Sequence, residues 1–242
     1  MENFAALQAQ VDSAQHIVFL TGAGVSTPSG IPDYRSKSGL YTTGNTNRPT
    51  EYYLSHDCLV NEPAVFYQFV MKNLYYPDAQ PNVIQKKQAA FTNANRAAIV
   101  TQNIDNLYEA AGASHLHEFH GNLYRIYCQK CGAVVDYQTY AQSMYHQQDG
   151  GILRPDVVLY GEGINPDVVE ASVNAVMNAD LILIVGTSMR VYPFAGLLDY
   201  RQPNVPVVVI NQEHLDLPGA NTQYQLDASE VFDRLQVNPN HD

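Results

Sequence analysis

A short apolar run that breaks directly into two closely spaced glycines is the feature that most constrains this chain. Residues 17–20 read Ile-Val-Phe-Leu and predict a buried strand, and Gly22 and Gly24 follow at once. Glycines in this position let backbone amides approach an anion closely, so the stretch predicts a nucleotide-binding α/β protein. The fingerprint of hydride-transferring dehydrogenases is incomplete, because Thr27 stands where a third glycine belongs and helix breakers follow it up to Arg35.

Apolar runs that end in polar clusters predict a parallel sheet that is buried on both faces. Such runs occupy residues 97–101, 181–185 and 206–210, and helices are predicted near residues 3–14, 65–74, 83–95, 167–177 and 194–200. Ligand-binding residues of open α/β sheets lie at the carboxyl ends of the strands. We therefore expect one site built from Gly22-Ala23-Gly24, Gln102-Asn103-Ile104-Asp105, Gly186-Thr187-Ser188 and Asn211-Gln212-Glu213, with Asn211 and Glu213 as candidates for hydrogen bonds to ribose hydroxyls.

Charge and cysteine content argue against several classes of protein. The chain has 242 residues and a formal net charge of -11, which argues against a nucleic-acid partner and makes basic peptides more natural partners. No apolar run approaches the roughly 18 residues that span a membrane, and residues 1–15 lack the features of a signal peptide, so we expect a cytoplasmic protein with no membrane partner. The odd set Cys58, Cys128 and Cys131 argues against a disulfide framework.

Six motifs, taken together and in order, resemble those of bacterial-type sirtuins, which are NAD-dependent protein lysine deacylases. The motifs are residues 22–26, 29–36, 101–107, 120–122, 153–158 and 186–188, so the similarity extends over nearly the whole chain. The resemblance implies an α/β fold with a Rossmann-like large domain around a central parallel sheet. It also implies a small domain formed by a helical insertion and a zinc-type module.

The same resemblance implies domain boundaries. Residues 1–36, 96–126 and 152–242 are expected to form the Rossmann-like NAD-binding large domain. Residues 37–95 are expected to form the helical insertion, and residues 127–151 the zinc-type module. NAD and an acyl-lysine protein or peptide would meet in the cleft between the domains. The polar stretch at residues 36–50 is predicted to be a mobile loop that helps to exclude water.

The resemblance also implies which residues hold NAD. Asn103 and Asp105 are expected to hold its carboxamide and ribose region, Ile31 to line that pocket, and Tyr34 with Arg35 to cover the reacting sugar. The expected cofactor-binding residues are Gly22, Ala23, Gly24, Ser26, Ile31, Asp33, Tyr34, Arg35, Gln102, Asn103, Ile104, Asp105, His120, Gly186, Thr187, Ser188, Asn211, Gln212, Glu213 and Ala228.

His120 is the expected general base, because imidazole titrates near neutrality and can take a proton from a ribose hydroxyl. Asn103 is the second expected catalytic residue. The remaining histidines outside the metal module are interpreted as surface or core residues. The residues expected to bind the substrate peptide as an added strand are Val158, Tyr160, Gly161, Glu162, Val191 and Tyr192.

The acyl preference is predicted from the helical insertion. Sirtuins that prefer acidic acyl groups place a Tyr and an Arg three residues apart to bind the distal carboxylate. Here Tyr67 is kept, but Val70 stands where the Arg would be. A carboxylate would therefore lack its bidentate partner, so we expect neutral acyl groups, with acetyl first.

The metal module departs from the family pattern. Sirtuins generally carry two Cys-x-x-Cys pairs, and this chain has only Cys128 and Cys131. The missing cysteines fall on His146 and Asp149, which keep the spacing and are competent zinc ligands. Two alternatives stay open: a Cys-Cys-His-Asp zinc site, or a module that has lost zinc and folds through the packing of its tyrosines and valines.

The resemblance predicts an NAD-dependent protein lysine deacetylase that transfers the acetyl group to ADP-ribose and releases nicotinamide. A mono-ADP-ribosyltransferase or an NAD glycohydrolase on the same fold is the main alternative, because the loss of nicotinamide is common to all three. A protein that binds NAD or ADP-ribose without turnover is a further alternative, and it would need no base at His120.

Overall fold

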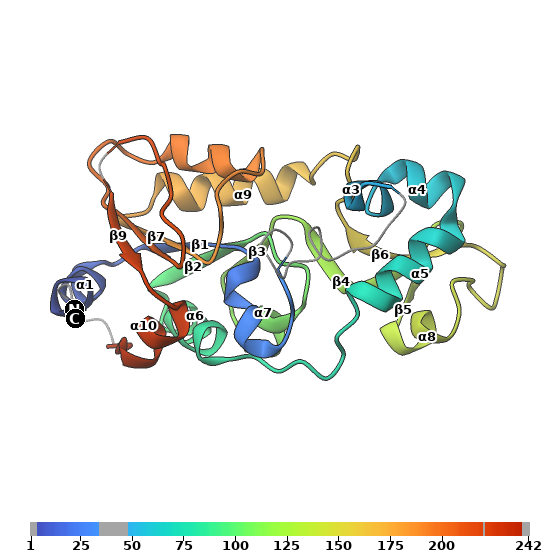
Figure 1. The fold of residues 1–242 in the computed structure, drawn as a ribbon, viewed down its shortest axis with the longest axis horizontal. Coiled ribbons are helices and arrows are strands. Elements are labelled where there is room, and N and C mark those ends of the chain that lie inside the picture. The colour runs from blue at the N-terminus through green and yellow to red at the C-terminus, as the bar shows by residue number, and fades with distance from the viewer. Residues whose placement is uncertain (1–3, 34–47, 220, 239–242) are drawn as a thin grey trace.

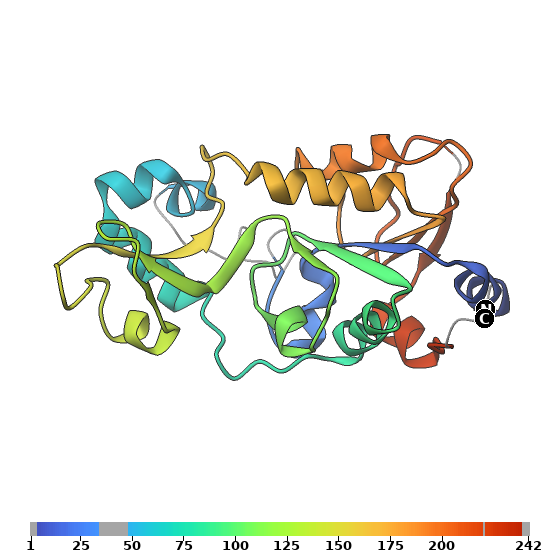
Figure 2. The same cartoon turned by 180° about the vertical axis from the view of Figure 1, so that it is seen from behind.

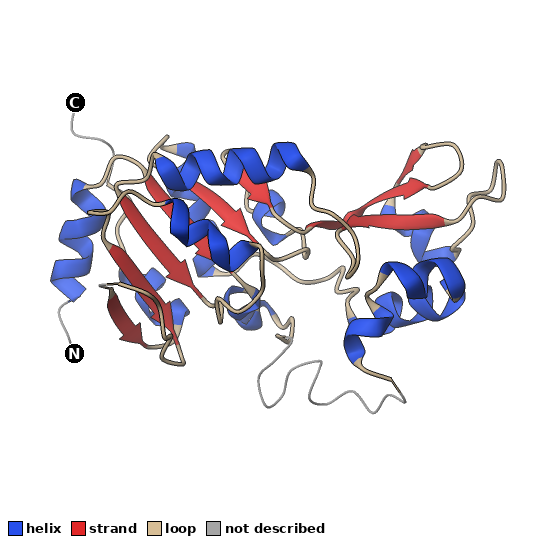
Figure 3. Ribbon diagram, turned by 90° about the horizontal axis from the view of Figure 1, so that it is seen from above, coloured by secondary structure: helices blue, strands red, loops and turns tan. Residues whose placement is uncertain are grey.

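The computed structural model describes residues 4–33, 48–219 and 221–238, and these form two lobes of unequal size (Figures 1 and 3). The large lobe contains a six-stranded sheet in the order β3-β2-β1-β7-β8-β9, in which all neighbouring strands are parallel. The strands are β1 (Ile17–Thr21), β2 (Ala97–Thr101), β3 (Leu116–Glu118), β7 (Leu181–Val185), β8 (Val207–Asn211) and β9 (Thr222–Gln225). The predicted central parallel sheet is confirmed.

Helices cover both faces of this sheet, as the two opposite views in Figures 1 and 2 show. One face packs against α1 (Phe4–Ser13), α6 (Val83–Asn93) and α10 (Ala228–Arg234), and the other against α9 (Pro166–Met177) and the 3-10 helix η3 (Phe194–Tyr200). Side chains of β1 alternate between the two cores: Phe19 packs on the first face and Leu20 on the second. Period-two alternation with both faces buried explains why the strand is apolar throughout.

The small lobe is built on a second, antiparallel sheet in the order β5-β4-β6. Its strands are β4 (Gly121–Cys128), β5 (Val134–Val135) and β6 (Leu153–Val157). Helices α4 (His56–Asn61), α5 (Pro63–Asn73) and α8 (Tyr137–Gln142) contribute to its core, and α3 (Thr50–Tyr53) lies beside α4 and α5. Since β4 begins one residue after His120, the small lobe is attached directly to the edge of the large one.

The predicted elements agree with the structure except in a few places. Residues 194–200 form a 3-10 helix, and the stretch after the glycines forms two 3-10 turns, η1 (Ala23–Val25) and η2 (Thr27–Ser29). Strands β3, β4, β5, β6 and β9 and helices α3, α4, α7 (Leu107–Ala110) and α10 were not predicted. Most of the loop predicted at residues 36–50 lies outside the described residues.

The division into domains stays a proposal, and packing refines it at one point. Helix α6 was expected in the helical insertion, but Ile84 and Phe91 are buried in the same core as β1 and α10. We propose that the insertion ends before Asn82, which caps α6 through a capping box with Gln85. No helix among the described residues is long and apolar enough to cross a membrane.

The junction of β4 and β6 predicts a strong effect of one substitution. Gly121 has a φ of 81°, and an added Cβ would lie 2.0 Å from the carbonyl oxygen of Asp156. We expect Gly121→Ala to lower the free energy of unfolding by about 3 kcal/mol or more, measured by urea denaturation. Gly163→Ala is the control, because a Cβ there meets nothing within 4 Å, and a comparable loss in both variants would contradict the prediction.

Candidate active-site cleft

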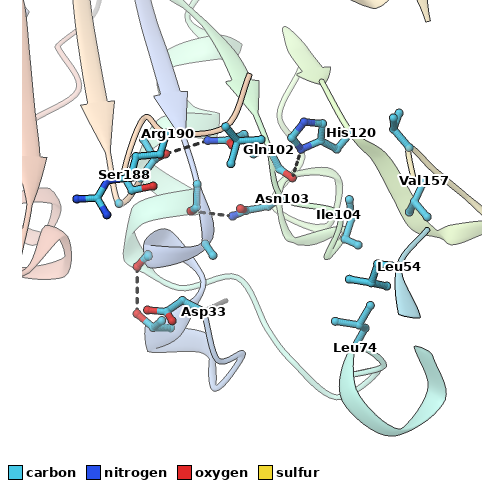
Figure 4. Close-up of a pocket in the computed structure, with 18 of the residues that line it drawn as sticks. Asp33, Leu54, Leu74, Gln102, Asn103, Ile104, His120, Val157, Ser188 and Arg190 are labelled. Carbon is cyan, nitrogen blue, oxygen red and sulfur yellow. Dashed lines mark hydrogen bonds between the residues drawn. The ribbon is translucent and has the colours of Figure 1, made fainter. Parts of the chain in front are cut away.

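A cleft of about 850 Å³ runs along the carboxyl edge of the large sheet and extends to the small lobe. Figure 4 shows Gln102, Asn103 and Ser188 on the sheet side, with Leu54 and Leu74 on the far side. The predicted site residues that line it are Gly22, Ala23, Gly24, Asp33, Gln102, Asn103, Ile104, His120, Val158, Tyr160, Gly161, Glu162, Gly186, Thr187, Ser188, Val191, Tyr192, Asn211, Gln212, Glu213 and Ala228. Residues from four strand ends thus meet in one place.

The two glycines after β1 serve close packing rather than anion binding through their own amides. The Gly22 amide donates to Val185 O at 3.2 Å and the Gly24 amide to Gly186 O at 2.8 Å. A Cβ on Gly24 would lie 2.8 Å from Gly186 Cα. The amides of Gly22 and Gly24 are therefore not available to an anion. Among the amides of residues 22–24, only that of Ala23 donates no hydrogen bond to another described residue.

The side chain of Asn103 is held in the cleft by two hydrogen bonds to the loop that follows β1. Its Nδ2 donates to Gly22 O at 3.0 Å and to Ser26 Oγ at 3.1 Å. Because both contacts use the nitrogen, the amide oxygen is the atom left for a ligand. Ser26 is itself buried and donates to Asp105 Oδ2, so it acts behind Asn103 and does not line the main cleft.

A second cavity of about 30 Å³ adjoins the main cleft. It is lined by Ser26, Ile31 and Asp105, and it shares Asn103 and Ile104 with the main cleft. Burial raises the pKa of Asp105, and hydrogen bonds from Ser26 and the Leu107 amide oppose that effect. Three residues expected at the nicotinamide end of NAD therefore gather in a side pocket about one water molecule in size.

His120 lies where the two lobes meet, and its tautomer is set by one hydrogen bond. Its Nδ1 lies 3.2 Å from Gln102 O. Since a carbonyl oxygen can only accept, Nδ1 carries the proton and Nε2 carries the lone pair when the ring is neutral. Burial lowers the pKa of His120. A neutral imidazole beside the cleft with Nε2 unprotonated has the state that a general base requires.

The predicted peptide-binding segment, residues 158–162, is already paired on one side. Val158 N donates to His120 O, and Tyr160 N donates to Leu54 O, both at 2.9 Å. The Glu162 amide donates to Leu159 O at 2.9 Å, and its carboxylate accepts two hydrogen bonds from Arg154. Across the cleft, Tyr192 has a largely exposed side chain, and Val191 lies beside it.

The far end of the cleft contains the last two strand ends. Asn211 Nδ2 donates to Glu213 O at 2.9 Å, which closes the turn after β8. Ala228 begins α10, and Asp227 caps that helix by accepting from Ser229 N. Asp33 lies in this cleft as well, whereas Tyr34 and Arg35 lie outside the described residues.

Some residues that line the cleft were not predicted from the sequence. Arg190, Leu226 and Asp227 line the cleft, and Arg190 is the single Lys or Arg among the described residues that do so. Leu226 and Asp227 follow the polar strand β9, whose sequence Thr-Gln-Tyr-Gln has no apolar pattern. Arg190 lies two residues after Ser188, close to the end of β7, so its place near a strand end was the available signal.

The four predicted metal ligands come together in the small lobe. Their ligand atoms all lie within 4.8 Å of one another. Cys128 Sγ is 3.5 Å from Asp149 Oδ1, and Cys131 Sγ is 3.6 Å from His146 Nδ1. A tetrahedral zinc site with bonds of roughly 2.0–2.3 Å has ligands about 3.3–3.8 Å apart. The donor set therefore fits a zinc ion held by four side chains, and these two separations lie within the tetrahedral range.

The fold and the cleft define a nucleotide-binding α/β protein in which an inserted lobe completes the site. The model of the Sir2 family matches residues 22–193. The chain belongs to the Sir2 family, as the six motifs predicted.

Relatives and solved structures agree with this assignment. The chain is 57% identical to an NAD-dependent protein deacetylase of Lactiplantibacillus plantarum, over 98% of this chain and 100% of that protein. It is 51% identical to an NAD-dependent protein deacetylase of Listeria innocua, over 93% of this chain and 97% of that protein. A Sir2 structure with p53 peptide and NAD+ has a TM-score of 0.82 and 27% identity, covering 96% of both chains. A complex of a Sir2 homologue with ADP-ribose has a TM-score of 0.83 and 30% identity, covering 96% of this chain and 94% of that one.

The metal cluster predicts zinc in the purified protein. We expect about one zinc ion per chain by elemental analysis, because two thiolates, an imidazole and a carboxylate gathered in one place bind zinc tightly. His146→Ala and Cys131→Ala should each lower the zinc content strongly. Cys58→Ala is the control, since Cys58 is buried in α4 and lies outside the cluster. A metal-free wild-type protein with a folded small lobe would support the alternative in which side-chain packing replaces zinc.

Proposed function

We propose that this chain is an NAD-dependent protein lysine deacetylase that transfers the acetyl group of acetyl-lysine to ADP-ribose and releases nicotinamide and free lysine. The observation that carries the proposal is His120, which lines the cleft with Nδ1 bonded to Gln102 O at 3.2 Å. The names of relatives at 57% and 51% identity support it. A cytoplasmic location stays a prediction from the sequence.

His120 acts as the general base in this proposal. Nε2 takes a proton from a ribose hydroxyl, and the hydrogen bond from Nδ1 to Gln102 O stabilises the resulting imidazolium. Phe119 and Phe194 pack beside the ring, with the Phe194 centroid 6.5 Å from that of His120. These aromatic neighbours keep water from one side of the base.

Asn103 and the side cavity serve the nicotinamide end in this proposal. The amide oxygen of Asn103 accepts a hydrogen bond from the carboxamide, and Ser26 holds the Asn103 nitrogen in place. Asp105 and Ile31 form the wall of the side cavity. Arg190 and the Ala23 amide are then the candidate groups for binding the diphosphate, because the amides of Gly22 and Gly24 are occupied.

The acyl end of the cleft is apolar, which favours neutral acyl groups. Val70, Leu74 and Ile104 line it, together with Leu54, Leu123, Val157 and Leu159. Tyr67 does not line the cleft, since its hydroxyl donates to the carbonyl oxygens of Tyr140 and Ala141. Both members of the pair that would bind an acidic acyl group are thus unavailable, and a buried carboxylate without a partner is costly.

The peptide enters between two segments in this proposal. Gly161 lies on one side and Val191 with Tyr192 on the other, and all three line the cleft. Backbone hydrogen bonds to both segments would bind an extended peptide with little dependence on its sequence. An ADP-ribosyltransferase or an NAD glycohydrolase stays the alternative, because it would use the same NAD site.

Replacing His120 by Ala tests the proposal. We expect NAD-dependent deacetylation of an acetyl-lysine peptide by the wild type, and a loss of kcat of roughly 10²- to 10⁴-fold in His120→Ala, followed by mass spectrometry of the peptide. His115→Ala is the control, because that ring is exposed and bonds only to Asn95 among the described residues. Nicotinamide release with the acetyl group untouched would favour the glycohydrolase instead.

The environment of His120 predicts the pH dependence of the reaction. The base works in its neutral form, and burial lowers its pKa from the usual value of 6.5. The rate should therefore be constant at neutral pH and fall as the pH drops through a midpoint below 6.5. The measurement is kcat/KM for the peptide from pH 5 to 8 at saturating NAD, and a midpoint above the usual histidine value would contradict the assignment.

A further inference from the structure

Glu162 stands at the cleft edge, yet its carboxylate is almost fully occupied by the protein. Oε1 accepts from Arg154 Nη1 at 2.7 Å and lies 3.1 Å from His56 Nδ1. Oε2 accepts from Arg154 Nη2 at 3.0 Å and from the Leu159 amide at 3.1 Å. With four donors on two oxygens, the carboxylate has little capacity left for a substrate group.

Arg154 anchors this carboxylate from the core of the small lobe. Its side chain is only 8% exposed, and it also donates to Val157 O at 2.8 Å and to Pro155 O at 3.2 Å. The two parallel bonds to Glu162 form a bidentate pair, which is directional as well as strong. These interactions lower the pKa of Glu162 to about 2 against the opposing effect of burial, so the group is an anion at neutral pH.

His56 joins the same carboxylate from the helical insertion. Its ring reaches Glu162, and its backbone amide donates to Tyr160 O at 2.9 Å. Tyr160 N in turn donates to Leu54 O at 2.9 Å, which makes a short parallel bridge between the two segments. The insertion is thus tied to residues 158–162 by both backbone and side chain.

The hydrogen bonds within residues 158–162 and to the helical insertion leave few backbone groups available to a ligand in the cleft. The amides of Val158, Leu159, Tyr160 and Glu162 all donate within the protein. Gly161, with a φ of 90°, is the residue of this segment whose N–H and C=O have no hydrogen-bond partner in the described part of the chain. It lines the cleft, so its backbone is the available edge for an extended substrate.

We infer that Glu162 is a positioning residue for the substrate peptide: it joins Arg154, the Leu159 amide and His56, and so holds the backbone of Gly161 toward the cleft. The inference rests on the proposed deacetylase function, and it adds a role for the Glu162 side chain to the backbone pairing that the resemblance implied for this segment. Loss of the carboxylate frees the turn at residues 159–161 and leaves Arg154 buried without its counter-charge. Peptide binding weakens, while the NAD end of the cleft is unaffected.

Steady-state kinetics of Glu162→Gln against an acetyl-lysine peptide tests the inference. We expect the KM for the peptide to rise about tenfold, with kcat and the KM for NAD changed less than about twofold. Glu109→Gln is the matched control, because Glu109 also pairs with an arginine, Arg125, but lies outside the cleft. The affinity for ADP-ribose, measured by calorimetry, should be equal in the wild type, Glu162→Gln and Glu109→Gln.

A second pair of variants changes His56, which is exposed, and so leaves the buried core of the small lobe intact. The His56 side chain is 53% exposed, so His56→Ala removes one contact to Glu162 without opening a cavity in the core and should raise the peptide KM about threefold. His56→Asn places an amide nitrogen near the position of Nδ1 and should restore the wild-type value. An unchanged peptide KM in Glu162→Gln and His56→Ala, an equal rise in the KM for NAD, or a fall in kcat alone would overturn the inference. Failure of the wild type to deacetylate the peptide would instead reject the proposed function.

Discussion

The close approach of the loops after β1 and β7 is the contact on which the rest of the site depends. Gly24 N donates to Gly186 O at 2.8 Å, and no side chain fits between the two backbones. This contact places Thr187 beside the end of β2, where its Oγ1 accepts from Gln102 Nε2 at 2.8 Å. Gln102 O then accepts from His120. The hydrogen bond that sets the tautomer of the base is therefore the last in a series of contacts that begins where the loops after β1 and β7 meet.

The small lobe supplies the other half of the site through β4, the strand that begins directly after His120. Tyr124 on β4 stacks with Tyr75, with ring centroids 5.7 Å apart, and meets Tyr137 edge-on at 5.1 Å. The Tyr124 hydroxyl also accepts from the Tyr76 amide at 3.1 Å. These contacts join the helical insertion to the metal module independently of the four metal ligands. The aromatic packing is thus a stabiliser of the lobe that is separate from the four candidate metal ligands.

Much of the fold and the cleft could be predicted from the sequence, because apolar strands that end in polar clusters carry a direct signal. Strand β9 and the first turn of α10 carry no such signal, so Leu226 and Asp227 were missed. Other roles depend on partners distant in sequence. Gly22 was read as an anion-binding glycine, but a Cβ there would lie 2.7 Å from Thr187 Cβ, which only the paired strands reveal. Tyr67 likewise bonds to α8, at a separation of more than seventy residues.

The arrangement of the side cavity explains why the glycine loop departs from the dehydrogenase pattern. A hydride-transferring enzyme keeps nicotinamide attached and beside its substrate, so a helix that begins directly after the glycines serves it well. Here the chain makes two 3-10 turns and then passes Ile31 and Pro32 across the side cavity, opposite Asn103 and Asp105. A small side pocket that adjoins the main cleft and presents Asn103 and Asp105 among apolar residues suits a group that must leave its ribose. Thr27, where a third glycine was expected, therefore marks a change of chemistry and not a defective dinucleotide site.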